Sequence, residues 1–259
     1  MILFETLGVV AGVIFVFVTV LFFLSLLVRR NDIADSAWGV GVFLVGLVPA
    51  VLYGASGVAM VVLSVAGIWA ARLSLRIILR NRKKTEDVRY RAWRESWGRW
   101  FYLRSYGQIY LLQGSLMIAV GYVLLHAVVY GSAMEIGTAT IAGLVVWLIG
   151  FFFEAVGDYQ LDRYLALPQK PSSVMQEGLW KYTRHPNYFG EVTMWWGVWL
   201  MVLPTDYGYW AVISPLMITF LILKVSGIPM LEKHFADNPE FVEYKRRTSA
   251  FFPWPPRKI

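Results

Sequence analysis

Residues 184–191, which read Arg-His-Pro-Asn-Tyr-Phe-Gly-Glu, place charged and hydrogen-bonding side chains directly before an apolar, tryptophan-rich run at 192–203. Polar groups kept at the edge of a membrane segment usually have a function. Pro186 fits the first position of a helix, which leaves Asn187 and Glu191 four residues apart on one face, where they could hold an amide or a ribose. The structural alternative is that Asn187 caps the helix and Glu191 pairs with an arginine. Three further side chains at the same depth favour a binding site: Arg184, His185 and Tyr188.

Glu154 and Asp158 form a second candidate, again four residues apart. Two carboxylates on one helical face repel each other, so this pair needs either cations or a ligand whose hydroxyl groups it accepts. Arg72, Arg76 or Lys224 could supply the cation. A structural ion-pair network and a ligand site both remain open for this pair.

Three arginines, Arg72, Arg76 and Arg80, recur every four residues along one apolar stretch. Arg80 is expected to extend to lipid phosphate at the membrane surface. Arg72 is too deep for that, so we expect it to meet a carboxylate or an anionic group of a ligand.

Asp32 and Asp35 lie at the entry to another apolar stretch, with Trp38 one turn further in. Asp32 is typical of a residue that begins a helix. Asp35 lies deeper and could be a carboxylic acid that burial keeps protonated, able to donate a proton.

The composition predicts the structure that positions these residues. The chain has 58% hydrophobic and 16% charged residues, against about 25% charged in an ordinary soluble domain. This predicts an all-α integral membrane protein with about seven transmembrane helices in a single domain, 1–259. Most of the predicted spans approach the roughly 20 residues that a bilayer requires: 7–28, 34–53, 58–79, 109–130, 136–156, 188–203 and 207–225.

Basic residues predict the orientation of these spans. Of the 24 Lys and Arg residues, 22 fall in the loops and the tail on one side, and cytoplasmic loops retain positive charge. The N-terminus is therefore predicted outside and the C-terminus inside. The same asymmetry, together with anionic lipid, explains the net charge of +7 better than nucleic-acid binding does.

Several classes of site are excluded or disfavoured by residue type. The chain has no cysteine, and its three histidines, at 126, 185 and 234, lack metal-ligand spacing, so no metal is predicted. The glycine-rich turn of dinucleotide-binding folds is also missing. A nucleotide would have to be held by helices and loops.

Residues 178–191, followed by Trp196 and Gly197, resemble the signature of the bacterial DUF1295 branch of the steroid 5-alpha-reductase family. The likeness extends across most of the chain, including 35–39, 85–90 and the Glu-Tyr-Lys-Arg-Arg-Thr tail. It implies a seven-helix reductase that takes hydride from NADPH and saturates a carbon-carbon double bond conjugated to a carbonyl in a steroid-like or other lipid substrate.

The resemblance also implies roles for individual residues. The cofactor-binding half would be about 150–259, and the C-terminal segment would close over the nucleotide. The animal enzymes have a Gln-Glu pair in the span where this chain has Asp32 and Asp35, so it is our own hypothesis, apart from the resemblance, that Asp35 with Tyr90 polarises the substrate carbonyl. The residues expected at the cofactor are Arg72, Glu154, Asp158, Arg184, Asn187, Tyr188, Glu191 and Tyr244.

Two other functions remain open. The arginine-histidine-proline stretch is also similar to isoprenylcysteine and phospholipid methyltransferases, which use S-adenosylmethionine. A non-enzymatic lipid-binding or scaffold protein is the third possibility. For the reductase, we expect a bacterial inner-membrane location, contact with membrane lipids and an active site that opens to the cytoplasm.

Overall fold

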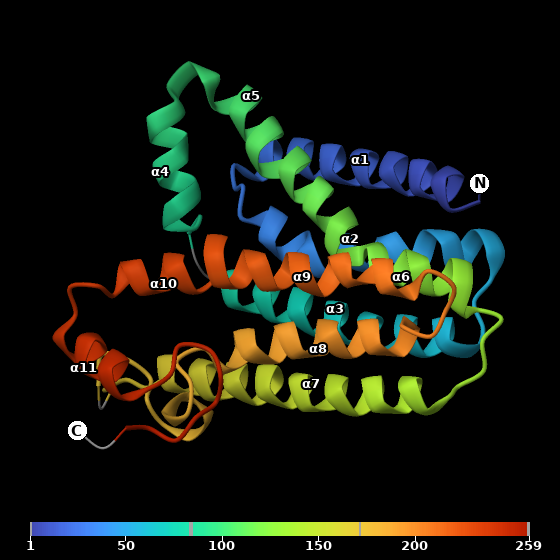
Figure 1. Cartoon of the computed structure of the whole chain (residues 1–259). Coiled ribbons are helices and arrows are strands. Elements are labelled where there is room, and N and C mark those ends of the chain that lie inside the picture. The colour runs from blue at the N-terminus through green and yellow to red at the C-terminus, as the bar shows by residue number, and fades with distance from the viewer. Residues whose placement is uncertain (1, 83–84, 171, 258–259) are drawn as a thin grey trace. The chain divides into compact units, whose positions relative to one another are not determined.

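The computed structural model describes residues 2–82, 85–170 and 172–257, and over these ranges it is built from helices without a β-strand (Figure 1). The chain divides into two compact units. Unit 1 comprises Met1–Gly137 and Val202–Ser214, and unit 2 comprises Thr138–Met201 and Pro215–Ile259. The predicted all-α membrane fold is confirmed.

Unit 1 is a bundle in which α2 is central. Helix α2 packs against α6, α3 and α1. Its apolar side chains Val42 and Val45 are fully buried. A Cβ atom placed on Gly121 of α6 would lie 2.7 Å from the Cβ of Val45, so the two helices approach closely only because position 121 lacks a side chain. The four long helices are α1 (Ile2–Val28), α2 (Ile33–Tyr53), α3 (Gly57–Asn81) and α6 (Leu112–Gly131).

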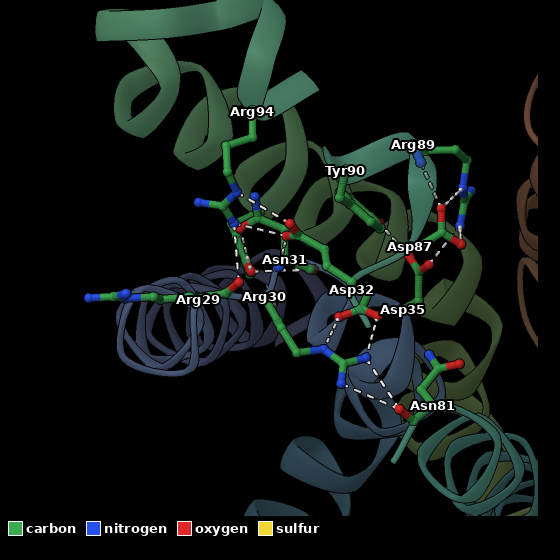
Figure 2. A network of polar contacts seen from close by, with 12 residues as sticks. Arg29, Arg30, Asn31, Asp32, Asp35, Asn81, Asp87, Arg89, Tyr90 and Arg94 are labelled. Atoms are coloured by element: carbon green, nitrogen blue, oxygen red, sulfur yellow. Dashed lines mark hydrogen bonds and ion pairs between the residues drawn. The ribbon is translucent and has the colours of Figure 1, made fainter. Parts of the chain in front are cut away.

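The segment between α3 and α6 contains short helices that are tied to the start of α2. It comprises α4 (Val88–Trp97), α5 (Phe101–Ser105) and a π-helical stretch, Tyr106–Leu111. The Glu86 carboxylate accepts a hydrogen bond from the backbone N–H of Asn31 at 2.8 Å and pairs with Arg94 at 2.9 Å (Figure 2). Positions 83 and 84, which precede these short helices, lie outside the described residues.

Unit 2 contains most of the predicted cofactor-binding half. The turn between α10 and α11 is capped by Asn238, whose side-chain oxygen accepts the N–H groups of Glu240 and Phe241. An asparagine cap followed by Pro239 is typical of the first residues of a helix. The helices associated with this unit are α7 (Thr138–Leu165), α8 (Pro186–Val202), α9 (Ile213–Phe220), α10 (Ile228–His234) and α11 (Pro239–Arg247); Val202 and the first two residues of α9 fall in unit 1.

Glycines spaced seven residues apart bring α7 and α8 together. A Cβ on Gly150 would lie 2.6 Å from the Gly190 carbonyl oxygen, and a Cβ on Gly190 would lie 2.4 Å from the Glu154 nitrogen. Seven residues are about two helical turns, so the glycines of each helix share one face. Such small residues let membrane helices approach at backbone distance. We call this set the glycine seam: Gly143, Gly150 and Gly157 on α7, and Gly190 and Gly197 on α8.

Replacing Gly190 by alanine is expected to destabilise the protein by about 1–3 kcal/mol, because the new methyl group would press on the α7 backbone, which cannot move aside as a side chain can. The measurement is thermal unfolding of the full-length protein in detergent. Gly12→Ala is the matched control, since a Cβ on this α1 glycine meets nothing within 4 Å. A midpoint for Gly190→Ala equal to that of Gly12→Ala would contradict the close packing of the seam.

Within the described residues, six helical segments are long and apolar enough to cross a membrane. They are Ile2–Val28, Ile33–Tyr53, Gly57–Asn81, Arg89–Gly131, Thr138–Leu165 and Gly208–His234. The predicted sixth span corresponds to α8, which has 17 residues and is shorter than the roughly 20 of a typical span. The count of seven and the orientation of the termini stay predictions.

Candidate functional site

Unit 1 brings three polar side chains, Arg89, Tyr90 and Gln113, to Asp35 near the start of α2, and Figure 2 shows the first two beside Asp35. The Tyr90 hydroxyl donates to Asp35 Oδ1 at 2.6 Å, and Arg89 Nη2 donates to Asp35 Oδ2 at 3.0 Å. Gln113 Nε2 lies 3.5 Å from Asp35 Oδ1. We call Asp35, Arg89, Tyr90 and Gln113 the acid cluster.

The acid cluster joins a buried tyrosine to a half-buried carboxylate by a short hydrogen bond. Tyr90 is only 3% exposed, so its hydroxyl depends on Asp35 for a partner. The amide oxygen of Gln113 is buried and has no hydrogen-bond partner among the described residues. A buried acceptor without a partner is costly. The Asp35–Tyr90 pair, next to the unpartnered Gln113 amide oxygen, can therefore form hydrogen bonds to a polar group of a ligand and polarise it.

Asp32 does not join this cluster. It precedes α2 as predicted, but its side chain makes no capping bond. Instead, both of its oxygens accept from Arg30, at 3.0 and 2.7 Å, and the Arg30 guanidinium also donates to the Asn81 carbonyl oxygen (Figure 2). The predicted position of Asp32 at a helix start is confirmed, and its side chain pairs with the arginine two residues earlier, which offers a charge-assisted partner.

In unit 2, α7 and α8 place a carboxylate beside an amide. Pro186 is the first residue of α8, as predicted, and the position of a Cβ on Gly157 would lie 3.2 Å from the Asn187 nitrogen. This close approach lets Asn187 Nδ2 donate to Asp158 Oδ1 at 3.1 Å. Asp158 is 3% exposed, so this hydrogen bond is buried on the carboxylate side.

The other residues expected at the cofactor are placed only in part. Glu154 is buried on α7, one turn before Asp158, and Glu191 is half-buried on α8, one turn after Asn187. Arg72 belongs to α3 in unit 1. Its predicted meeting with the two α7 carboxylates stays a prediction.

Arg184 is held by an ion-pair cluster in unit 2. Its Nη2 lies 2.6 Å from Glu232 Oε1, while Lys245 Nζ lies 3.0 Å from Glu232 Oε2. Arg184 Nη1 donates to the carbonyl oxygen of Thr248. The adjacent His185 ring stacks on Tyr188 with centroids 5.5 Å apart. The sequence pattern did not reveal Glu232 as the partner, since it lies 48 residues further along the chain.

The C-terminal segment packs against the loop before α8. The Tyr244 hydroxyl donates to the Trp180 carbonyl oxygen, and burial raises the pKa of Tyr244 above its usual value. Thr183 forms a bridge with Ser249, and the Trp254 N–H donates to the Tyr182 carbonyl oxygen at 2.9 Å. Tyr244 thus fixes the loop that leads into residues 184–191.

Two cavities border Arg184 within unit 2. One, of about 220 Å³, is mostly apolar and includes Trp180, Phe235, Phe241 and Tyr244 in its wall. The other, of about 380 Å³, is lined by five basic residues: Arg184, Lys245, Arg246, Arg247 and Arg257. Glu232 and Glu243 pair with some of these cations. The pairs leave an excess of positive charge, and we call the second cavity the basic pocket.

Burial lowers the pKa of His185 below its usual value, although the Glu232 carboxylate oxygen 3.4 Å away favours the charged ring. The folded protein therefore holds this ring neutral over a wider pH range than the unfolded chain, whose histidines titrate near 6.5. As the pH falls through 6.5 the unfolded state takes up the proton first, so stability decreases.

We accordingly expect the thermal midpoint to fall as the pH drops from 7 towards 5. This one group lowers the free energy of unfolding by at most about 1.4 kcal/mol per pH unit. His185→Gln should flatten this part of the profile, whereas His234→Gln, at an exposed position, should not. Equal profiles for wild type and His185→Gln would contradict the assignment.

Comparison with known proteins identifies one match. The family model described as "Protein of unknown function (DUF1295)" matches residues 21–248. No curated protein and no solved structure matches the chain.

Proposed function

The chain belongs to the DUF1295 family, and on that premise we propose that it is a membrane-embedded, NADPH-dependent reductase. Its substrate would be a lipid or steroid-like molecule with a carbon-carbon double bond conjugated to a carbonyl. This activity is the one implied by the resemblance to the steroid 5-alpha-reductases, with a bacterial inner-membrane location and a cofactor pocket on the cytoplasmic side.

The basic pocket is the observation that carries the choice of cofactor. NADPH has three phosphate groups, and phosphates are preferentially recognised by clustered arginine and lysine side chains. The basic pocket offers five such residues, among them Arg246, Arg247 and Arg257. S-adenosylmethionine has no phosphate, so a methyltransferase would gain little from this arrangement.

The rest of unit 2 has side chains suited to the other parts of a dinucleotide. The mostly apolar cavity beside the basic pocket has aromatic residues in its wall that could stack on a planar ring. Asp158 and Asn187 can accept from and donate to ribose hydroxyls or a carboxamide. Arg184 adjoins both cavities and would position a phosphate. NADPH, when bound, supplies a hydride.

The acid cluster of unit 1 is assigned to the substrate carbonyl. In this proposal, Asp35 is protonated when the substrate binds, so that the hydrogen-bonded Asp35–Tyr90 pair holds two protons and donates one to the carbonyl oxygen as negative charge develops there. Arg89, 3.0 Å from Asp35, would stabilise the carboxylate that remains once the proton has been transferred. The apolar helices would exclude water from the reacting groups.

The test is reduction of conjugated enones by the purified full-length protein in lipid nanodiscs. The proposal expects NADPH-dependent product that has gained two hydrogen atoms, detected by mass spectrometry. Methyl transfer from S-adenosylmethionine to a prenylated cysteine or a phospholipid, without enone reduction, would establish the alternative function.

A further inference from the structure

Unit 1 also contains a groove of about 630 Å³ that the proposed function does not use. One stripe from each of three helices lines it, namely α1 from Phe17 to Val28, α2 from Ile33 to Val40, and α3 from Ser74 to Asn81, together with Arg82 directly after α3. The α1 stripe has a length of about 16 Å at the helical rise per residue. Most of the lining is apolar, and all three helices are long and apolar enough to span a membrane.

The groove faces away from the acid cluster. The α2 residues that line it are Ile33, Ser36, Ala37 and Val40, a spacing that defines one face of a helix. Asp35 lies on the opposite face of α2, at helical periodicity, where it bonds to Tyr90. The groove and the acid cluster are therefore separate features of unit 1.

One end of the groove is polar and positively charged. Arg30 pairs with Asp32 at 2.7 Å and donates to the Asn81 carbonyl oxygen (Figure 2). Arg82, at the same end, is exposed and has no acidic partner among the described residues. Since the charges of Arg30 and Asp32 cancel, Arg82 gives this end of the groove a net positive charge.

A second polar feature lies deeper in the groove. Ser74 is 6% exposed, and its hydroxyl has no hydrogen-bond partner in the part of the chain that the structure describes. It precedes Arg82 by eight residues, about 12 Å along the helix. A buried hydroxyl without a partner carries a desolvation penalty that a bound acceptor would remove.

We propose that this groove binds one anionic glycerophospholipid. The phosphate would lie against Arg30 and Arg82, because hydrogen bonds between a guanidinium and a phosphate are charge-assisted and therefore strong. Below the phosphate of such a lipid, towards the hydrocarbon, are ester carbonyl oxygens, and one of these would accept from Ser74 Oγ. An acyl chain would follow the apolar stripe of α1. The net positive charge favours an anionic over a zwitterionic headgroup, whose ammonium Arg82 would repel.

The test is native mass spectrometry of the full-length protein in detergent, titrated with phosphatidylglycerol or phosphatidylcholine and without nucleotide. Wild type is expected to bind one phosphatidylglycerol about tenfold more tightly than phosphatidylcholine, the effect of one good charge-assisted contact. Arg82→Gln should remove most of this preference. Ala37→Leu, which fills the groove, should weaken the binding of both lipids. Ser74→Ala should lower the affinity for phosphatidylglycerol about threefold.

Arg80→Gln is the matched control, because Arg80 is an exposed arginine of α3 that does not line the groove. An equal loss in Arg80→Gln and Arg82→Gln would show attraction to surface charge in general and overturn the proposal. Equal affinity of wild type for the two lipids, unchanged in every variant, would show a nonspecific lipid annulus and overturn it as well. Arg82 is exposed, so its replacement should leave folding intact even if Ala37→Leu does not. The result is independent of whether the protein is a reductase.

Discussion

Asp35→Asn is expected to lower the turnover of a conjugated enone by about 100-fold while the protein remains folded and still binds NADPH. The substitution keeps the size of the side chain but removes the carboxyl group that accepts from Tyr90 at 2.6 Å. General acid catalysis by one positioned group contributes about 10²–10⁴-fold. The measurement is the rate of enone reduction at saturating NADPH, with the thermal shift by NADPH recorded in parallel.

Asp87→Asn is the matched control for this experiment. Asp87 also pairs with Arg89, at 2.9 Å, and no contact joins it to the Tyr90 hydroxyl in the described structure. It should therefore retain turnover within a few-fold of wild type. Tyr90→Phe separates the roles within the pair: a loss equal to that of Asp35→Asn indicates that the two act as a unit. Normal turnover in Asp35→Asn would place the proton donor elsewhere.

Asn187→Ala, Asp158→Asn and Glu191→Gln are each expected to abolish most of the thermal stabilisation that NADPH confers. In the proposed function the nucleotide contacts the Asn187–Asp158 pair, whose Nδ2 and Oδ1 atoms are 3.1 Å apart, and also Glu191 one turn further along α8. Each substitution therefore changes a group that the nucleotide would contact. A ligand present at 100 times its Kd stabilises the folded state by about 2.7 kcal/mol. A 100-fold loss of affinity removes nearly all of this effect.

Asp206→Asn, which makes the same chemical change at an exposed position, should leave the NADPH effect unchanged. The midpoint of each variant without nucleotide shows whether it is folded. Full stabilisation by NADPH in all three site variants would exclude the α7 and α8 pair from the cofactor site.

Local features of the fold could be predicted from the sequence. Continuous apolar runs locate the long helices, and Pro186 correctly predicts the first residue of α8, because proline favours the first turn, where its missing N–H is not needed. The Asp-Asn-Pro sequence likewise predicts the turn before α11. Each of these signals depends only on neighbours in the chain.

Contacts between distant segments could not be predicted in the same way. Arg184 was expected at a ligand, which stays a prediction, but its ion pair with Glu232 could not be foreseen, because that pairing depends on how the tail folds back on the loop. The seven-residue spacing of Gly143, Gly150 and Gly157 is visible in the sequence and could have indicated the glycine seam. The unpartnered hydroxyl of Ser74 has no sequence signal at all, because it depends on which faces of α1, α2 and α3 meet.

The two units also differ in what their sequences indicate. In unit 2, residues 184–191 form one polar run in the sequence, so this part of the candidate site was predictable, whereas the approach of the basic tail, with Lys245 61 residues after Arg184, was implied only by the family resemblance. In unit 1, Asp35 and Tyr90 are 55 residues apart. Their pairing was a hypothesis that followed from the need for an acid, and no periodic pattern supports it.

The central claim is that unit 2 binds a phosphate-rich nucleotide, and thermal unfolding of the detergent-solubilised full-length protein tests it most directly. NADPH is expected to raise the midpoint, and NADH to raise it less, because NADH lacks one phosphate for the basic pocket. S-adenosylmethionine is expected to leave the midpoint unchanged. A rise with S-adenosylmethionine and none with NADPH would contradict the account.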